Sequence, residues 1–236
     1  MAEKEGKPRQ KRQFVRFGAY RVDPAWRRLP QEERDASRKE FLAALEESRA
    51  SLMIRTYSCL GTRGDCDFLL WMISDRLEAF QELQARLLKS SLGKYLTLPH
   101  SYLAMTRRSV YVDKHVHEGQ EGVRLAVKPG EAKYLFVYPF VKTRDWYRLT
   151  RSARQGMMDE HITVGHRYPT VKLNTSYSFG LDDQEFVVAF ESDVPADFLD
   201  LVMELRETEA SRYTARDTPI LTGVAVPAAE MLELLG

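Results

Sequence analysis

The sequence predicts an α+β protein built from two copies of a β-α-β-β-α-β unit. Stretches with the alternating apolar pattern of strands are interspersed with amphipathic stretches of helix type, in the same order in both halves of the chain. A shift of 118 positions also places identical residues on one another without a gap. The matched pairs are Phe68 and Phe186, Ser74 and Ser192, Asp75 and Asp193, Phe80 and Phe198, Leu83 and Leu201, Leu87 and Leu205, and Tyr95 and Tyr213.

This unbroken run of matches indicates an internal repeat. Several matches are core positions of amphipathic helices, which coincide by chance in many pairs of helices, but a gapless series is harder to obtain that way. A unit with this order of elements buries one face of an antiparallel sheet under its helices. We therefore expect a duplicated ferredoxin-like fold, with antiparallel sheets and helices packed on them.

Composition narrows the classes of function. The chain has 236 residues, enough for one large domain or two closely packed small ones. Its formal net charge of +1 gives no field that would attract nucleic acid or an anionic membrane. No apolar run approaches the ~20 residues that span a bilayer. The N-terminus lacks the apolar core of a secretory signal, so we expect a cytoplasmic protein.

The N-terminal half is expected over residues 13–113, after a flexible basic arm over residues 1–12. Proline favours the first turn of a helix, and aspartate is a good helix cap. The expected elements are a strand over 14–22, a helix from Pro30 through Leu45, strands over 52–59 and 68–73, a helix capped by Asp75, and a strand over 102–112.

The C-terminal half is expected over residues 132–236, after a polar, glycine-containing connecting loop over residues 114–131. Loops of such length are usually functional or disordered. The expected elements are strands over 134–141, 171–179, 185–191 and 220–226, helices over 150–165 and 193–209, and a short helix at the end of the chain.

Cys59 and Cys66 flank a glycine-containing turn that could bring them together across a hairpin. In a reducing compartment two free thiols are favoured over a disulfide. No histidine lies near them in the sequence, so they do not make a zinc site.

One histidine has the setting of a ligand. On the helix expected over 150–165, Met157, His161 and Val164 share a face, since spacings of three and four residues stack on one side. Such a histidine is most often a satisfied core residue, and the alternative is an axial ligand to haem iron in an apolar crevice. His115 and His117 form a pair in the connecting loop, but no carboxylate or thiol partner for a metal is evident.

Tyr138 lies in an otherwise apolar strand and is followed by a cluster of cations and aromatics. Its ring can simply pack, or its phenol can face a cofactor as a proton or electron donor. Lys142, Arg144 and Trp146 come next along the chain. Cations flanked by aromatics suit carboxylate binding at the mouth of a pocket, and a solvated strand end suits them equally.

Several of these residues belong to motifs that resemble the chlorite dismutase family, a haem protein family that includes the coproheme decarboxylases. The motifs are Tyr-Pro-Phe-Val-Lys at 138–142, Asp-Trp-Tyr at 145–147, Glu-His at 160–161, Tyr-Pro at 168–169, Gly-Leu-Asp-Asp-Gln-Glu at 180–185 and Leu-Arg-Glu-Thr-Glu-Ala-Ser at 205–211. The resemblance implies a porphyrin held by the C-terminal half, within a homo-oligomer that is often a pentamer.

The resemblance also implies roles for individual residues. His161 matches the histidine that ligates the iron, and Glu209 matches the glutamate that hydrogen-bonds its other nitrogen. Lys142 and Trp146 match residues near the haem edge, and Met157 is expected to line the crevice.

The distal side separates the branches of the family. Chlorite dismutases carry a distal arginine 13 residues after the iron-ligating histidine, and Asn174 occupies that position here. A neutral amide cannot replace a guanidinium in binding an oxyanion, which weakens the hypothesis that the protein degrades chlorite.

Coproheme decarboxylases instead use a tyrosine, matched by Tyr138, whose oxidised radical abstracts hydrogen from the propionates at positions 2 and 4. A distal histidine acts as base in one branch, so His115, His117 or neither takes that role. Ser211 resembles a serine that contacts a propionate, and Lys142 and Arg144 are expected to help position these carboxylates.

The resemblance therefore implies a cytoplasmic oxidoreductase that converts coproheme to haem b with hydrogen peroxide. Coproheme (iron-coproporphyrin III) would be both the substrate and the redox centre. Two alternatives remain: a haem b enzyme that degrades chlorite, and a haem carrier or sensor without turnover.

Overall fold

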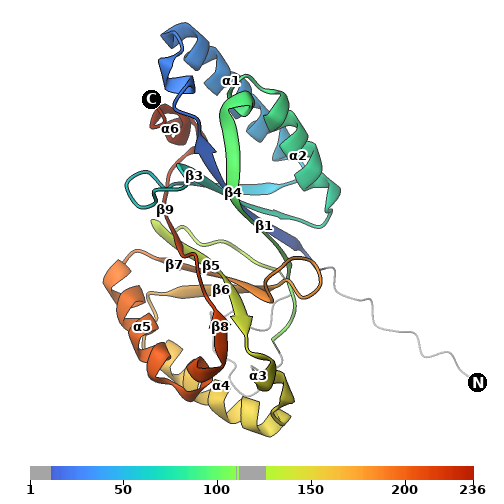
Figure 1. The fold of residues 1–236 in the computed structure, drawn as a ribbon, viewed down its shortest axis with the longest axis vertical. Helices are drawn as coiled ribbons and strands as arrows, with labels where there is room; N and C mark the ends of the chain where they lie inside the picture. The colour runs from blue at the N-terminus through green and yellow to red at the C-terminus, as the bar shows by residue number, and fades with distance from the viewer. Residues whose placement is uncertain (1–11, 110, 112–125) are drawn as a thin grey trace, which may run out of the picture.

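The computed structural model describes residues 12–109, 111 and 126–236, which Figure 1 draws in colour. His115 and His117 lie outside the described residues, as do nearly all of the basic arm and most of the connecting loop. Among the described residues, no helix is long and apolar enough to cross a membrane.

Each half of the chain contains the expected series of strands and helices. The N-terminal half comprises β1 (Phe14–Val22), α1 (Gln31–Ser48), β2 (Met53–Ser58), β3 (Phe68–Ser74), α2 (Glu78–Lys89) and β4 (Leu96–Met105), with 3₁₀ turns at Trp26–Arg28 and Leu92–Tyr95. The C-terminal half comprises β5 (Tyr134–Lys142), α3 (Arg144–Arg148), α4 (Arg151–Gly165), β6 (Lys172–Tyr177), β7 (Phe186–Ser192), α5 (Pro195–Glu207), the 3₁₀ helix η4 (Glu209–Tyr213), β8 (Thr214–Arg216), β9 (Leu221–Ala225) and α6 (Ala228–Glu233).

The strand order confirms the duplicated ferredoxin-like fold. In the first half the order is β4-β1-β3-β2, and in the second it is β9-β5-β7-β6, which is the same permutation of first, second, third and fourth strand. All pairings are antiparallel. The two sheets join where β2 pairs with β9 and β4 pairs with β6. Helices α1 and α2 lie at one end of the molecule together with α6, the last helix of the C-terminal half, and α3, α4 and α5 lie at the other end, with the strands between them (Figure 1).

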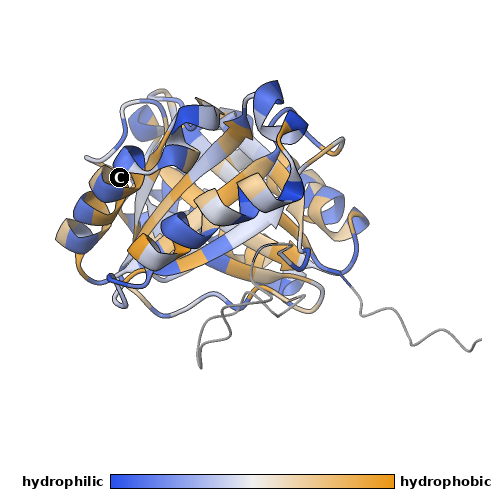
Figure 2. Cartoon of the chain, turned by 90° about the horizontal axis from the view of Figure 1, so that it is seen from below, coloured by the Kyte–Doolittle hydropathy of each residue, from blue (hydrophilic) through white to orange (hydrophobic). Residues whose placement is uncertain are grey.

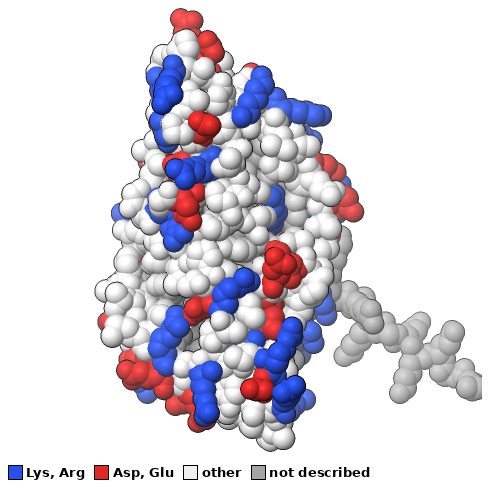
Figure 3. Space-filling model, viewed as in Figure 1, with Lys and Arg blue, Asp and Glu red and all other residues white. Residues whose placement is uncertain are grey.

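Alternation along the strands divides the interior into three cores. Val137 and the residues that point to the same side of the strands pack between the two sheets. Phe136 and Tyr138 point to the other side and face the helices of the C-terminal half. A third core lies between the N-terminal sheet and its helices, around Phe41 and Phe68. Figure 2 shows hydrophobic strands behind helices whose outward faces are largely hydrophilic. Figure 3 shows both signs of charge interspersed on the face that it draws.

Three element predictions need correction. The strand expected over 102–112 is β4, which begins at Leu96 and ends at Met105. Pro99 lies inside this strand, where its lack of an N–H is tolerated because β4 has little pairing with β6 on its outer edge. Asp75 is not the cap of α2, because Ser74 Oγ accepts the N–H of Arg76 in a turn and the helix begins only at Glu78.

The third correction concerns two elements that the sequence pattern did not predict. The segment around Arg144 and Trp146, interpreted as a strand end, folds into the short helix α3. The strand β8 pairs with the end of β5 beside it. The start of α4, by contrast, is as expected: the hydroxyl of Thr150 accepts the N–H of Ala153 at 3.2 Å.

Candidate functional site

The layer between sheet and helices is closed in the N-terminal half and open in the C-terminal half. Phe68 and Leu70 of β3 are both 0% exposed, but the repeat-related Phe186 and Val188 of β7 are only half-buried. The helices differ in the same way. Of α4 only Val164 is buried, whereas α1 buries Ser37, Phe41, Ala44, Leu45 and Ser48. The second copy of the unit therefore leaves its apolar layer between sheet and helices partly exposed, and we call this layer the crevice.

Tyr138 lies on the sheet side of this crevice. It is 8% exposed, and its ring stacks on Phe190 of the neighbouring strand with centroids 6.0 Å apart. Burial raises the pKa of its phenol far above the usual range, and the nearby carboxylate of Asp217 adds to this. The phenol is therefore protonated at any working pH.

The internal repeat relates Tyr138 to Tyr20, and the two differ in one respect. The hydroxyl of Tyr20 donates to Gln84 Oε1 of α2 at 2.7 Å. The repeat places Val202 of α5 where Gln84 stands, and valine offers no acceptor. The structural partner of this tyrosine has thus been removed in the copy that is open.

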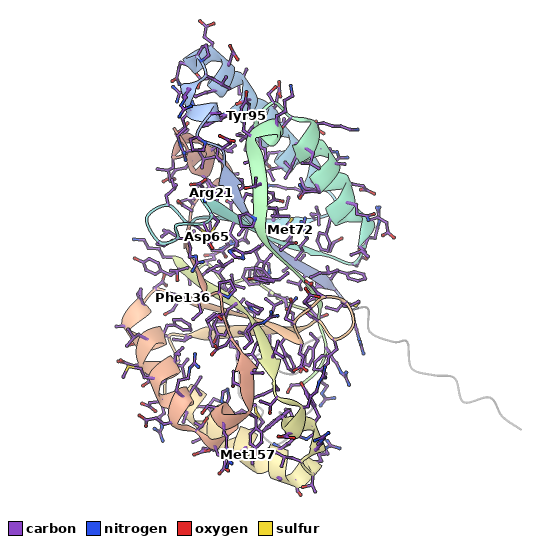
Figure 4. All side chains as sticks on the ribbon, viewed as in Figure 1. Arg21, Asp65, Met72, Tyr95, Phe136 and Met157 are labelled. Atoms are coloured by element: carbon purple, nitrogen blue, oxygen red, sulfur yellow. The ribbon has the colours of Figure 1, made fainter. Side chains whose placement is uncertain are left out.

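His161 projects from α4, on the helix side of the crevice. Its Nδ1 is buried and has no hydrogen-bond partner among the described residues. Burial and, to a smaller extent, the cation of Lys142 lower the pKa of the imidazole to about 4, while Glu160 opposes the shift. A buried polar atom without a partner costs about 1–3 kcal/mol, so its retention points to a ligand. Figure 4 labels Met157, on α4, and Phe136, on the sheet side.

Two more buried polar atoms without described partners lie on α4 and at the start of α3. They are Nε of Arg154, two helical turns before His161 on α4, and the hydroxyl oxygen of Thr143 at the start of α3. Sequence reasoning missed both residues, because an arginine or threonine near a helix start usually contacts solvent. Only the fold shows that these atoms are buried.

Lys142 forms the end wall of the site. Its ammonium donates to the carbonyl of Ala210 in η4 at 2.6 Å and lies 4.7 Å from the centre of the Trp146 indole. Burial lowers the pKa of Lys142 to about 8, although the carboxylate of Glu185 raises it. Glu185 Oε2 also accepts the backbone N–H of Lys142 at 2.8 Å and the hydroxyl of Tyr147. Lys142 and Trp146 are thus brought together as expected.

Three other expected residues lie at the margin. Arg144 is 87% exposed along its side chain, with a 3.7 Å ion pair to Glu185. The hydroxyl of Ser211 donates to the carbonyl of Arg206 at 2.6 Å. Glu209 does not hydrogen-bond His161 in this structure: its side chain is exposed, and its backbone N–H donates to Glu160 Oε2 at 3.2 Å.

Asn174 does not face the crevice, which corrects its expected distal position. It pairs with Ala189, a residue of the core between the two sheets, and its amide donates to the buried Glu191 Oε2 at 2.9 Å. The neighbouring Thr175 pairs with Val188, which in turn pairs with Tyr138. Directly paired residues share a face, so Thr175 and Tyr138 lie on the same side and Asn174 on the other.

Cys59 and Cys66 are free thiols and lie outside this site. Both are buried in the core between the two sheets. Among the described residues, no group of three or more histidine, cysteine, aspartate or glutamate side chains could hold a metal ion. Within the described part of the chain, any metal held by the crevice would depend on a carrier with ligands of its own, such as a porphyrin.

Comparisons with known proteins agree with this fold. The chain is 30% identical to a coproheme decarboxylase of Mycolicibacterium smegmatis over 191 residues, covering 80% of each chain. It is 25% identical to a chlorite dismutase of Ideonella dechloratans over 226 residues, covering 94% of this chain and 79% of that one. The structure of chlorite dismutase from Candidatus Nitrospira defluvii in complex with imidazole matches with a TM-score of 0.85 and 27% identity, covering 94% of each chain. The chlorite dismutase family model matches residues 12–226, and this chain belongs to that family.

Proposed function

We propose that this protein binds coproheme in the crevice between α4 and the C-terminal sheet and converts it to haem b with hydrogen peroxide. The observation that carries the proposal is the buried Nδ1 of His161, which has no partner among the described residues, on the helix that borders the open layer beneath Tyr138. The similarity to a coproheme decarboxylase supports the choice of substrate.

His161 would be the residue that ligates the iron. Because the pKa of the imidazole is lowered to about 4, the ring is neutral near pH 7 and keeps a lone pair for the metal. The bound iron porphyrin would supply the redox centre for the reaction with peroxide. The hydrogen bond from the Glu209 backbone to Glu160 ties η4 to α4 beside His161, which supports the position of this helix.

Tyr138 would carry the oxidation to the propionates. Its raised pKa keeps the phenol protonated, so it acts as a hydrogen-atom relay and not as a phenolate. After losing a proton and an electron, it takes a hydrogen atom from a propionate side chain and is restored. The propionate then loses a second electron and carbon dioxide, which leaves a vinyl group.

The reaction balances with one hydrogen peroxide for each propionate. Conversion of one propionate to a vinyl group releases carbon dioxide, one proton and two electrons. Hydrogen peroxide takes up these two electrons together with that proton and one more from solvent, and becomes two water molecules. Two such rounds convert coproheme to haem b.

Cationic and hydroxyl donors at the margin of the crevice would hold the carboxylates. Arg154 Nε and the hydroxyl of Thr143 are buried with no described partner, and Lys142 is a cation at the end wall. A carboxylate placed against these donors would satisfy them with charge-assisted hydrogen bonds. Arg144 and Ser211 are near enough in sequence to add contacts at the rim.

Mass spectrometry of coproheme incubated with the purified protein and hydrogen peroxide tests the proposal. We expect sequential loss of two carboxyl groups, through an intermediate that has lost one. Tight binding with an unchanged porphyrin mass contradicts catalysis and leaves a haem carrier. Oxygen release when the haem b-loaded protein is given chlorite, without decarboxylation of coproheme, supports the other enzymatic branch.

We also propose that the protein works as a homo-oligomer. Leu199 and Met203, one turn apart on α5, are 57% and 60% exposed, an unusual position for large apolar side chains. Sedimentation equilibrium tests this: the proposal fails if the protein is a monomer at all concentrations.

A further inference from the structure

The ammonium of Lys142 lies against a buried indole, and its hydrogen-bond partner is a neutral carbonyl. Trp146 is 3% exposed, and the lysine nitrogen lies 4.7 Å from its ring centre. The partner of that nitrogen is the neutral carbonyl of Ala210, and among the described residues it forms no ion pair. The carboxylate of Glu185 acts on Lys142 without an ion pair to its nitrogen among the described residues, so it offsets the field of the cation at the indole only in part.

Trp146 also contacts two tyrosines that lead away from the site. Its ring centre is 5.6 Å from that of Tyr213 and 6.4 Å from that of Tyr111. Both tyrosines are partly exposed, whereas the indole between them is buried. Electrons move readily between aromatic rings that lie this close, so the three residues form a path from the wall of the crevice to the surface.

This path competes with the proposed role of Tyr138. The charge of Lys142 acts on His161, which shows that the end wall and the candidate iron ligand are electrostatic neighbours. An oxidant formed at His161 could therefore take an electron from Trp146 as well as from Tyr138. The Trp146 hole would be refilled by an electron from Tyr213, whose phenol proton passes to water. One oxidising equivalent would then be lost without release of carbon dioxide.

We propose that Lys142 shields Trp146 from oxidation and so keeps the oxidising equivalents of the reaction on Tyr138. Removal of an electron from the indole creates a positive charge next to an ammonium, in a buried setting where screening is weak. Oxidation of Tyr138 creates no net charge, because the phenol loses its proton together with the electron. The cation therefore disfavours the leak far more than the productive step. This inference rests on the proposed function, since hydrogen peroxide is the oxidant.

A photochemical experiment tests the shielding without any porphyrin. The unloaded protein is flashed with a soluble ruthenium polypyridyl oxidant, and the yield of tryptophan radical is measured by transient absorption. Trp26 and Trp71 can also contribute to the radical signal. The share of the radical yield due to Trp146 is therefore the part that is lost when Trp146 is replaced by phenylalanine. We expect Lys142→Met to raise this share on the order of tenfold and Lys142→Arg, which keeps the charge, to leave it near the wild-type value. An equal share in all three proteins overturns the proposal.

A second experiment places the shielding in the reaction. Coproheme-loaded protein is given hydrogen peroxide, and peptide mapping follows oxidation of Trp146, Tyr213 and Tyr111 together with the peroxide consumed for each carbon dioxide released. We expect Lys142→Met to raise both quantities and the double variant Lys142→Met/Trp146→Phe to lower them again. If Lys142 has only a structural role, the double variant should consume as much peroxide for each carbon dioxide as the single variant does. That result would contradict the shielding.

The two experiments separate this inference from the function on which it rests. If the wild-type protein does not decarboxylate coproheme but the photochemical result holds, the proposed function fails while the electrostatic effect of Lys142 on Trp146 stands. If decarboxylation proceeds but Lys142→Met leaves the Trp146 radical yield unchanged, the shielding fails alone.

Discussion

At the scale of the residue, burial strengthens the neutral state of two side chains in the site. Burial holds His161 neutral by lowering its pKa to about 4, and burial holds the phenol of Tyr138 protonated by raising its pKa. The first state suits a metal ligand and the second suits a hydrogen-atom relay. The same physical cause, removal of water from the crevice, thus prepares both partners.

Replacement of His161 by alanine is expected to weaken coproheme binding at least about tenfold, because the iron loses its protein ligand. Titration followed through the Soret band measures this. Met157→Leu on the same helix is the matched control, since it keeps an apolar side chain of similar size, and it should bind as the wild type does. An unchanged dissociation constant in His161→Ala contradicts the assignment of the ligand.

The lowered pKa of His161 also makes the stability of the unliganded protein depend on pH. The unfolded histidine has a pKa of 6.5 and the folded one about 4, so between these values the unfolded state binds more protons. The free energy of unfolding should therefore fall as the pH falls, by up to about 2 kcal/mol between pH 7 and pH 5. Urea unfolding at the two values measures it. His161→Gln should remove this pH-dependent part of the free energy of unfolding. The same dependence on pH in both proteins would show that the imidazole is not buried.

At the scale of the element, the face of a strand decides which residues reach the site. Counting residues from His161 led to Asn174, but the loop between α4 and β6 need not preserve the register of its relatives, and a slip of one residue reverses the face. In the structure Thr175 faces the crevice with Tyr138, and Asn174 faces Glu191.

The register predicts opposite effects for neighbouring substitutions. Asn174→Ala removes a hydrogen bond from Glu191, which is 1% exposed, and should cost about 1–3 kcal/mol of stability while leaving the spectrum of bound coproheme unchanged. Thr175→Ala should alter that spectrum with little loss of stability. Urea unfolding and absorption spectra of both variants test this. A spectral change in Asn174→Ala and none in Thr175→Ala would show that Asn174, and not Thr175, faces the crevice.

The sequence predicted the long elements well, because each carries enough turns or alternations to reveal its period. The strand β1 and the helix α4 are examples. The short elements α3 and β8 have five and three residues, too few for a period, and their conformation is set by contacts with β5 and Glu185. Arg154 was missed for a related reason, since its burial depends on the packing of α4.

At the scale of the whole molecule, one fold has been used twice with different packing. The repeat was visible in the sequence from identical residues such as Phe68 and Phe186, and the strand orders confirm it. The difference between the copies was not visible there. Phe68 is fully buried in the first copy and Phe186 is half-buried in the second, because burial depends on how closely the helices approach the sheet.

The open layer should make the C-terminal helices less protected than the N-terminal ones. We expect amide hydrogens of α4 to exchange on the order of tenfold faster than those of α1 in the unliganded protein, because α4 has less buried side-chain contact to hold it. Coproheme should slow exchange in α4 and leave α1 unchanged. Hydrogen exchange followed by mass spectrometry measures both helices in one sample. Equal protection of the two helices without ligand would mean that the crevice is closed.

The most direct test of the account compares wild type and Tyr138→Phe, both loaded with coproheme and given hydrogen peroxide. The two proteins should bind coproheme equally, because phenylalanine keeps the stacking on Phe190 and the hydroxyl has lost its helix acceptor in this copy of the repeat. We predict that the wild type yields haem b by loss of two carboxyl groups, and that Tyr138→Phe yields none above the protein-free background. Decarboxylation by Tyr138→Phe at the wild-type rate would contradict the central claim.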